Sequence, residues 1–212
     1  MKGGVKAKRI FVNALTFLRV PLILAWLALA VYQEFDRSLL PAVLAVAAMF
    51  LSGISDLFDG MLARRWNVVS TLGKMADPLM DKIFYVVAFP AIVWQIARQG
   101  ESQAHALVML GFTILYLARD MWVTFMRSVG TMYGADVAAM WLGKVRTALS
   151  FPCAGWTYMY LAFHFLAPVE WQRIWLASCF VFEFALIALT LTSLFTYTVS
   201  YMPYLKKALE RK

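Results

Sequence analysis

Four aspartates lie close together in the sequence, between two apolar segments. Asp56 and Asp59 are three residues apart, and Asp77 and Asp81 are four apart. In an α-helix, spacings of three and four place side chains on the same face. Because the link between the two pairs is short, we expect two antiparallel neighbouring helices whose four carboxylates face each other at a similar depth.

Four carboxylates at a membrane boundary repel one another and resist desolvation, so they need positive charge nearby. One or two divalent cations would supply it, and a set of oxygen ligands without His or Cys favours Mg²⁺, Mn²⁺ or Ca²⁺. Alternatively, the acids pair without a metal with the basic residues that flank them in sequence, which are Arg64, Arg65, Lys74 and Lys82.

Small residues stand beside the aspartates. Gly60 and Gly73 weaken a helix, but they allow another molecule to approach the backbone closely, and Ala63 is small as well. Arg64 adds a planar guanidinium suited to phosphate. Carboxylates, a metal, small residues and an arginine together predict a site for a nucleotide that contains a diphosphate.

The full pattern resembles the signature of the CDP-alcohol phosphotransferase family. It reads Asp56-x2-Asp59-Gly60-x2-Ala63-Arg64-x8-Gly73-x3-Asp77-x3-Asp81. The resemblance implies a six-helix membrane fold, a homodimer, a polar cavity facing the cytoplasm, Mg²⁺ or Mn²⁺, and a CDP-linked donor. It also implies that all four aspartates bind metal, that Asp81 is in addition the catalytic base, and that the CDP pocket is lined by Asn13, Thr16, Gly60, Ala63, Arg64 and Gly73.

Looser motifs resemble the phosphatidylglycerophosphate synthases of that family. They are Asn13-x-Leu15-Thr16-x2-Arg19, Arg119-Asp120 with Arg127, and Gly143-Lys144-x-Arg146-Thr147. This resemblance implies a metal-dependent step of phospholipid biosynthesis: the hydroxyl of sn-glycerol 3-phosphate attacks the β-phosphorus of CDP-diacylglycerol, and CMP leaves. Three positions depart from the pattern, since Asp120 replaces Glu, Arg146 replaces Lys and Leu194 replaces Gly.

A phosphorylated acceptor carries close to two negative charges, so its pocket needs several cations. The candidates are Arg119, Arg127, Lys144 and Arg146. Arg119 lies within an apolar segment, where a cation needs a partner, and that partner is the acceptor phosphate, Asp120 or the aspartate cluster. Lys144 and Arg146 are equally typical of topology-determining charges at the mouth of a loop.

The elements that must position these residues are membrane helices. Of the 212 residues, 62% are apolar and 15% charged, which excludes a soluble monomer, and the 16% of aromatic residues exclude disorder. We expect an all-α integral membrane protein with one domain, residues 1–212, whose cytoplasmic N-terminal residues 1–12 include a short amphipathic segment. Its six transmembrane helices are predicted at Leu15–Tyr32, Leu39–Phe58, Met75–Ile96, Ala106–Phe125, Val145–Phe165 and Trp171–Tyr197.

The loops alternate in charge, and the basic ones are expected to face the cytoplasm. This places both termini and the aspartate cluster at the cytoplasmic face of the inner membrane, and it explains the net charge of +8 without nucleic acid. Two other interpretations stay open, a phosphatidylinositol phosphate synthase and, from another class, a divalent-cation transporter. The transporter is disfavoured because the acids are confined to one membrane edge and no internal repeat is visible.

Overall fold

The computed structural model describes residues 2–36, 38–100, 102–135 and 141–210, apart from the side chains of residues 2, 3 and 74. The described chain is helical and contains no strand, which confirms the all-α prediction. Its helices are α1 (Lys2–Gln33), α2 (Leu39–Arg65), α3 (Thr71–Gln99), α4 (Gln103–Met132), α5 (Trp141–Phe163) and α6 (Val169–Glu210), with a short 3₁₀ turn, η1 (His164–Leu166), before α6.

Apolar composition makes these segments helical, because a helix satisfies its own backbone hydrogen bonds in lipid. Within the described residues, five helices are long and apolar enough to cross a membrane, and α5 is not among them. The chain is therefore a multi-pass membrane protein, while its sixth span stays a prediction. The predicted amphipathic segment is the first part of α1, which continues without a break to Gln33.

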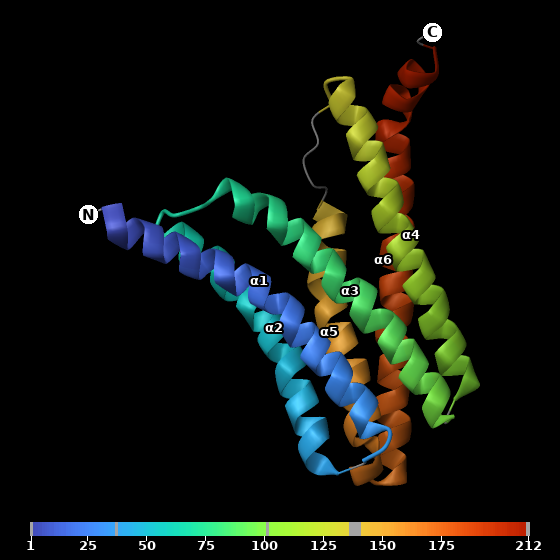
Figure 1. Cartoon of the computed structure of the whole chain (residues 1–212). Helices are drawn as coiled ribbons and strands as arrows, with labels where there is room; N and C mark the ends of the chain where they lie inside the picture. Colours follow the sequence, from blue (N-terminus) through green and yellow to red (C-terminus); the bar gives the residue numbers. More distant parts are fainter. Residues whose placement is uncertain (1, 37, 101, 136–140, 211–212) are drawn as a thin grey trace. The chain divides into compact units, whose positions relative to one another are not determined.

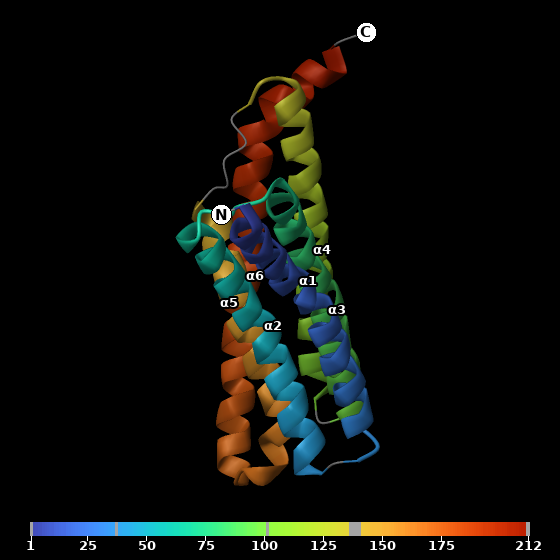
Figure 2. The same cartoon turned by 60° about the vertical axis from the view of Figure 1, so that its left-hand side comes forward.

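The chain forms two compact units. The sequence predicts a single domain, and that prediction stays untested. The first unit comprises Met1–Ile92 and Tyr158–Leu166, and in it α1 lies along α2 (Figures 1 and 2). The small residues Ala42 and Ala45 of α2 are fully buried. The ring of Trp26 on α1 meets that of Tyr158 edge-on, with centroids 5.1 Å apart.

The second unit comprises Val93–Thr157 and Ala167–Lys212, and in it α4 lies along α6 (Figures 1 and 2). Apart from the buried Thr113 of α4, the buried residues of each helix recur at steps of three or four, as in a coiled coil. On α4 they run His105, Met109, Phe112, Tyr116, Arg119, Val123, Met126 and Gly130; on α6 they run Cys179, Glu183, Leu186, Thr190, Ser193, Tyr197 and Tyr201. Polar side chains thus occupy core positions in this seam.

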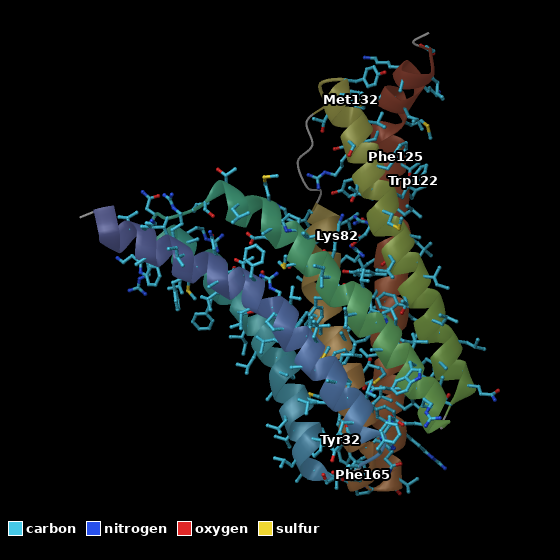
Figure 3. All side chains as sticks on the ribbon, in the orientation of Figure 1. Tyr32, Lys82, Trp122, Phe125, Met132 and Phe165 are labelled. Carbon is cyan, nitrogen blue, oxygen red and sulfur yellow. The ribbon has the colours of Figure 1, made fainter. Side chains whose placement is uncertain are left out.

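The other faces of the helices carry large apolar side chains. Trp122, Phe125 and Met132 project along α4 and are 38%, 49% and 81% exposed (Figure 3). Such a surface suits lipid better than water.

Candidate active site

Helix α1 brings three polar side chains to one face. Asn13, Thr16 and Arg19 are spaced by three residues, and Thr16 and Arg19 are buried. Because α1 packs along α2, this face lies against the part of α2 that carries Asp56 and Asp59.

The Arg19 guanidinium joins three of the four aspartates. Its Nη2 donates to Asp56 Oδ1 at 2.7 Å and to Asp59 Oδ2 at 3.0 Å, and its Nη1 donates to Asp81 Oδ1 at 2.7 Å. The cluster is therefore drawn together from α1, α2 and α3 by one planar cation, whose several donors suit this task better than a lysine would.

Burial differs among these carboxylates. The Asp59 side chain is 4% exposed and also accepts a hydrogen bond from Thr16 Oγ1 at 2.8 Å, whereas those of Asp56 and Asp81 are 44% and 43% exposed. Asp59 is thus fixed on two sides, and the other two carboxylates remain accessible to a ligand.

This counter-charge was not predicted from the sequence. The expected cations were basic residues that flank the aspartates, but the guanidinium among the aspartates belongs to Arg19, 40 residues from Asp59 and 62 from Asp81. The signal was present, since Arg19 shares one helix face with Asn13 and Thr16.

A small hollow that is open to solvent lies beside the cluster. Five of the six residues predicted to bind CDP line it, together with two predicted metal ligands: Asn13, Thr16, Gly60, Ala63, Gly73, Asp59 and Asp77. The structure thus brings these residues together, and their role in binding CDP stays a prediction.

Ser70 shapes one wall of this hollow. Its Oγ accepts from the Gly73 backbone N–H at 2.9 Å, as a capping side chain does at a helix start, and donates to Asn13 Oδ1 at 2.8 Å. The beginning of α3 is thereby tied to α1. Ser70 was not among the predicted site residues, although a serine just before a helix is an ordinary capping signal.

Arg64, the sixth predicted CDP ligand, is exposed at the end of α2 and is not among the residues that line the hollow. A Cβ added at Gly60 would lie 3.8 Å from Arg64 Nη2, so the guanidinium passes close to this glycine. Arg64 thus lies within reach of a ligand bound over Gly60.

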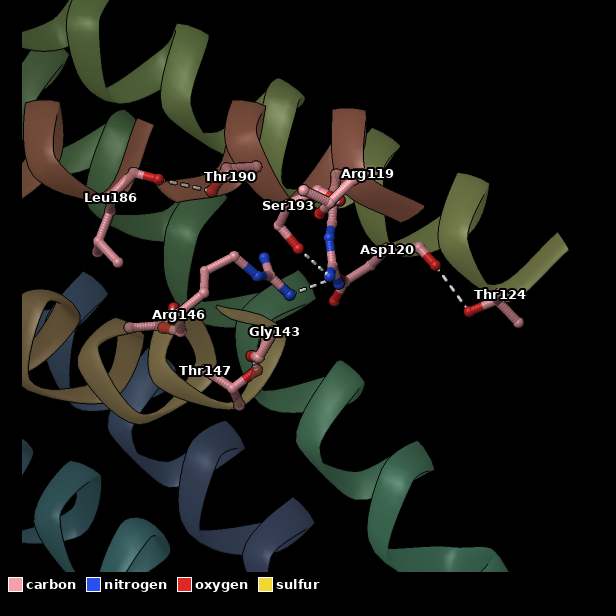
Figure 4. A network of polar contacts seen from close by, with 11 residues as sticks. Arg119, Asp120, Thr124, Gly143, Arg146, Thr147, Leu186, Thr190 and Ser193 are labelled. Atoms are coloured by element: carbon pink, nitrogen blue, oxygen red, sulfur yellow. Dashed lines mark hydrogen bonds and ion pairs between the residues drawn. The ribbon is translucent and has the colours of Figure 1, made fainter. Parts of the chain in front are cut away.

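The residues predicted to bind the acceptor belong to the second unit, and they differ in burial. Arg119 and Arg146 are buried and both donate to Asp120 Oδ1 (Figure 4). Arg127 is half-buried and Lys144 is exposed. The alternative in which Arg119 pairs with Asp120 is therefore confirmed, and the burial of Arg146 argues against a simple topology charge at that position.

Comparison with known proteins decides the family. A profile described as CDP-alcohol phosphatidyltransferase matches residues 9–182. The chain belongs to the CDP-alcohol phosphatidyltransferase family.

Similar proteins of known name come from bacteria. The CDP-diacylglycerol–glycerol-3-phosphate 3-phosphatidyltransferases of Pectobacterium atrosepticum and Salmonella choleraesuis are 33% and 32% identical, over 63% and 67% of this chain and 68% and 72% of their own length. The cardiolipin synthase (CMP-forming) of Streptomyces coelicolor is 33% identical over 49% of this chain, and the match spans less than half, 44%, of that protein.

CDP-alcohol phosphatidyltransferases generally depend on a divalent metal, and in this chain the predicted ligands are the four aspartates. In the described part of the chain, no three His, Cys, Asp or Glu side chains are arranged to hold a metal ion. The donor set nevertheless fits one: three carboxylates share the single charge of Arg19, and two of them are half-exposed. Such an excess of negative oxygen ligands suits Mg²⁺ or Mn²⁺, and the ligand assignment stays a prediction.

Proposed function

We propose that this family member transfers the phosphatidyl group of CDP-diacylglycerol to the hydroxyl of sn-glycerol 3-phosphate, with Mg²⁺ or Mn²⁺, releasing CMP. One observation carries the proposal: an aspartate cluster adjoins a hollow whose lining combines small residues with Asn13 and Thr16. The names of the Pectobacterium and Salmonella relatives support this choice of donor and acceptor.

The residues of the first unit would bind the donor in different ways. Gly60, Ala63 and Gly73 leave space for the nucleotide, while Asn13, Thr16 and Arg64 offer hydrogen bonds to it. We place one or two metal ions on Asp56, Asp59, Asp77 and Asp81. When bound, the metal would neutralise part of the negative charge of the diphosphate.

Asp81 is the proposed base. Its carboxylate is held by Arg19 and is 43% exposed, so it is both oriented and reachable. It would accept the proton of the acceptor hydroxyl as the new O–P bond forms at the β-phosphorus. The bond from that phosphorus to the bridging oxygen breaks, and CMP leaves with this oxygen.

The acceptor phosphate would bind to Arg119, Arg127, Lys144 and Arg146, of which Arg119 and Arg146 form a buried pair. We further propose that the protein works as a homodimer in the inner membrane, with the active site and both termini in the cytoplasm. The basic residues near the helix ends support this orientation.

Product analysis tests the function. Purified protein in detergent with lipid is given labelled CDP-diacylglycerol, Mg²⁺ and one acceptor at a time, and the lipids are separated by thin-layer chromatography. Phosphatidylglycerophosphate and equimolar CMP are expected with sn-glycerol 3-phosphate. Inositol phosphate tests the phosphatidylinositol phosphate alternative. Phosphatidylglycerol tests the alternative that the Streptomyces relative favours, a cardiolipin synthase. If sn-glycerol 3-phosphate gives no product, the proposal is wrong.

A further inference from the structure

Two arginines of the second unit converge on one carboxylate oxygen. Arg119 Nη1, from α4, donates to Asp120 Oδ1 at 3.0 Å, and Arg146 Nη2, from α5, donates to the same oxygen (Figure 4). Asp120 therefore fixes the distance between two guanidiniums that come from different helices.

This group carries one positive charge in excess. The side chains of Arg119 and Arg146 are only 7% and 2% exposed, and a buried cation without a partner is costly. Three of their buried nitrogens, Nε of Arg119 and Nε and Nη1 of Arg146, also lack a hydrogen-bond partner. Charge and donors together call for one more anion with several acceptor oxygens, as a phosphate monoester has.

Neutral groups hold the two arginines without cancelling that charge. Arg119 Nη2 donates to Ser193 Oγ, and its guanidinium lies 5.0 Å from the centre of the Tyr197 ring. The Arg146 guanidinium lies 4.0 Å from the centre of the Tyr116 ring. Hydroxyl and ring faces stabilise a cation and leave its net charge in place.

We propose that Asp120 is a positioning residue for the acceptor: it sets Arg119 and Arg146 at the spacing at which both bind the acceptor phosphate. Asp120 itself touches neither the acceptor nor the reacting atoms. The proposal rests on the proposed function, because it assumes that the anion completing the arginine pair is the phosphate of the acceptor alcohol.

Steady-state kinetics of CMP release test this role with Asp120→Asn and Asp120→Glu. Losing a hydrogen bond between charged groups is worth roughly tenfold or more in affinity, so Asp120→Asn should raise the KM for sn-glycerol 3-phosphate by about that factor. The KM for CDP-diacylglycerol should stay unchanged, and Asp120→Glu should restore most of the acceptor affinity. An unchanged or lowered acceptor KM in Asp120→Asn would overturn the proposal.

Ser193→Ala provides a second test in case Asp120→Asn does not fold. It removes one contact of Arg119 and should raise the acceptor KM by a smaller factor, again without effect on the donor KM. Thr192→Ala is the matched control, since the neighbouring Thr192 is exposed and its hydroxyl donates only to the Ala188 carbonyl among the contacts described. Equal kinetics in Ser193→Ala and Thr192→Ala would count against the proposal.

A binding measurement separates failure of this inference from failure of the proposed function. Inorganic phosphate should raise the Tm of the wild-type protein and of Thr192→Ala, and should raise that of Asp120→Asn less. If sn-glycerol 3-phosphate proves not to be a substrate but this difference is found, the proposed function is wrong and the positioning role stands. If phosphate shifts every Tm equally, or shifts none, the positioning role is wrong.

Discussion

Arg19 Nη1 donates to Asp81 Oδ1 at 2.7 Å and thereby joins residues that are 62 positions apart in the sequence. The carboxylate that we propose as the base is thus oriented by a guanidinium that also contacts Asp56 and Asp59. Three of the four aspartates proposed as metal ligands are therefore gathered around one cation.

Arg19→Met should destabilise the protein and make it depend on divalent cations. Without the guanidinium, the carboxylates repel one another and Asp59 stays buried, which should cost about 1–3 kcal/mol. Mg²⁺ should recover much of this loss, so adding Mg²⁺ should raise the Tm of Arg19→Met more than that of the wild type. Thermal unfolding in detergent, with Mg²⁺ or with a chelator, measures the difference.

Arg9→Gln is the matched control for that experiment, because Arg9 is an exposed arginine on the same helix. Its Tm should respond to Mg²⁺ as the wild type does. The same small response in Arg19→Met would show that Arg19 does not stand in for a divalent cation.

Asp77→Asn should abolish metal-dependent CMP release with little change in Tm. Asp77 lines the hollow and is half-buried, and it takes no part in the close ion pairs that join Arg19 to the other three aspartates, so its loss should affect the ligand more than the fold. We expect kcat to fall by about 100-fold or more, as it does when one group that stabilises the charge of a transition state is removed. CMP release over a Mg²⁺ titration measures this, with Asp36→Asn, outside the site, as control; wild-type turnover would refute the metal assignment.

Gly73→Ala should weaken binding of the donor. A Cβ at this position would lie 3.1 Å from Ser70 Oγ, which would have to shift by a few tenths of an ångström, and 3.5 Å from Asn13 Oδ1, an ordinary contact. The added methyl group would itself occupy part of the hollow. The KM for CDP-diacylglycerol should rise several-fold while the KM for the acceptor stays constant. Gly111→Ala is the control, because a Cβ there meets nothing within 4 Å and should stabilise helix α4 by about 0.5–1 kcal/mol. If the two alanine variants share the same donor KM, the hollow is not the donor site.

Gly130→Ala should destabilise the α4–α6 seam. Its Cβ would lie 2.5 Å from Tyr201 Cε1 and 2.6 Å from Cδ1, inside a core formed with Val123, Met126 and Tyr197. Overpacking of this kind costs about 1–3 kcal/mol. A lowered Tm that is partly recovered in the double variant with Tyr201→Leu would confirm the clash, whereas a wild-type Tm for Gly130→Ala would contradict it.

Apolar segments made the helices predictable, and every predicted span falls within the helix observed there, except that residues 164 and 165 form a 3₁₀ turn. Their ends were less predictable. Helix α1 begins well before Leu15 because its basic first turns are helical as well, and α6 continues past Tyr197 to Glu210. Hydropathy predicts the apolar part of a helix that lipid covers, but it does not predict how far the helix continues into polar residues.

The aspartates and the small residues were predictable because they lie on neighbouring segments joined by a short turn. Contacts between distant helices were not. Glu183 is fully buried and its Oε1 contacts His105 Nε2 at 2.8 Å, from α6 to α4, yet the sequence shows no link between them. The steps of three and four shared by both helices could have indicated that these residues, like Arg119 and Ser193, occupy one seam.

The first compact unit combines segments that are far apart in the sequence and are therefore translated at different times. Its core needs Tyr158 against Trp26, and Gln33 donates to the Ala162 carbonyl, although helices α4 and most of α5 are made in between. During synthesis, the first helices therefore lack these contacts until the ribosome has delivered residues 158–166. For the same reason, a chain severed after α3 and co-expressed with its remainder should regain this core only when the two fragments meet.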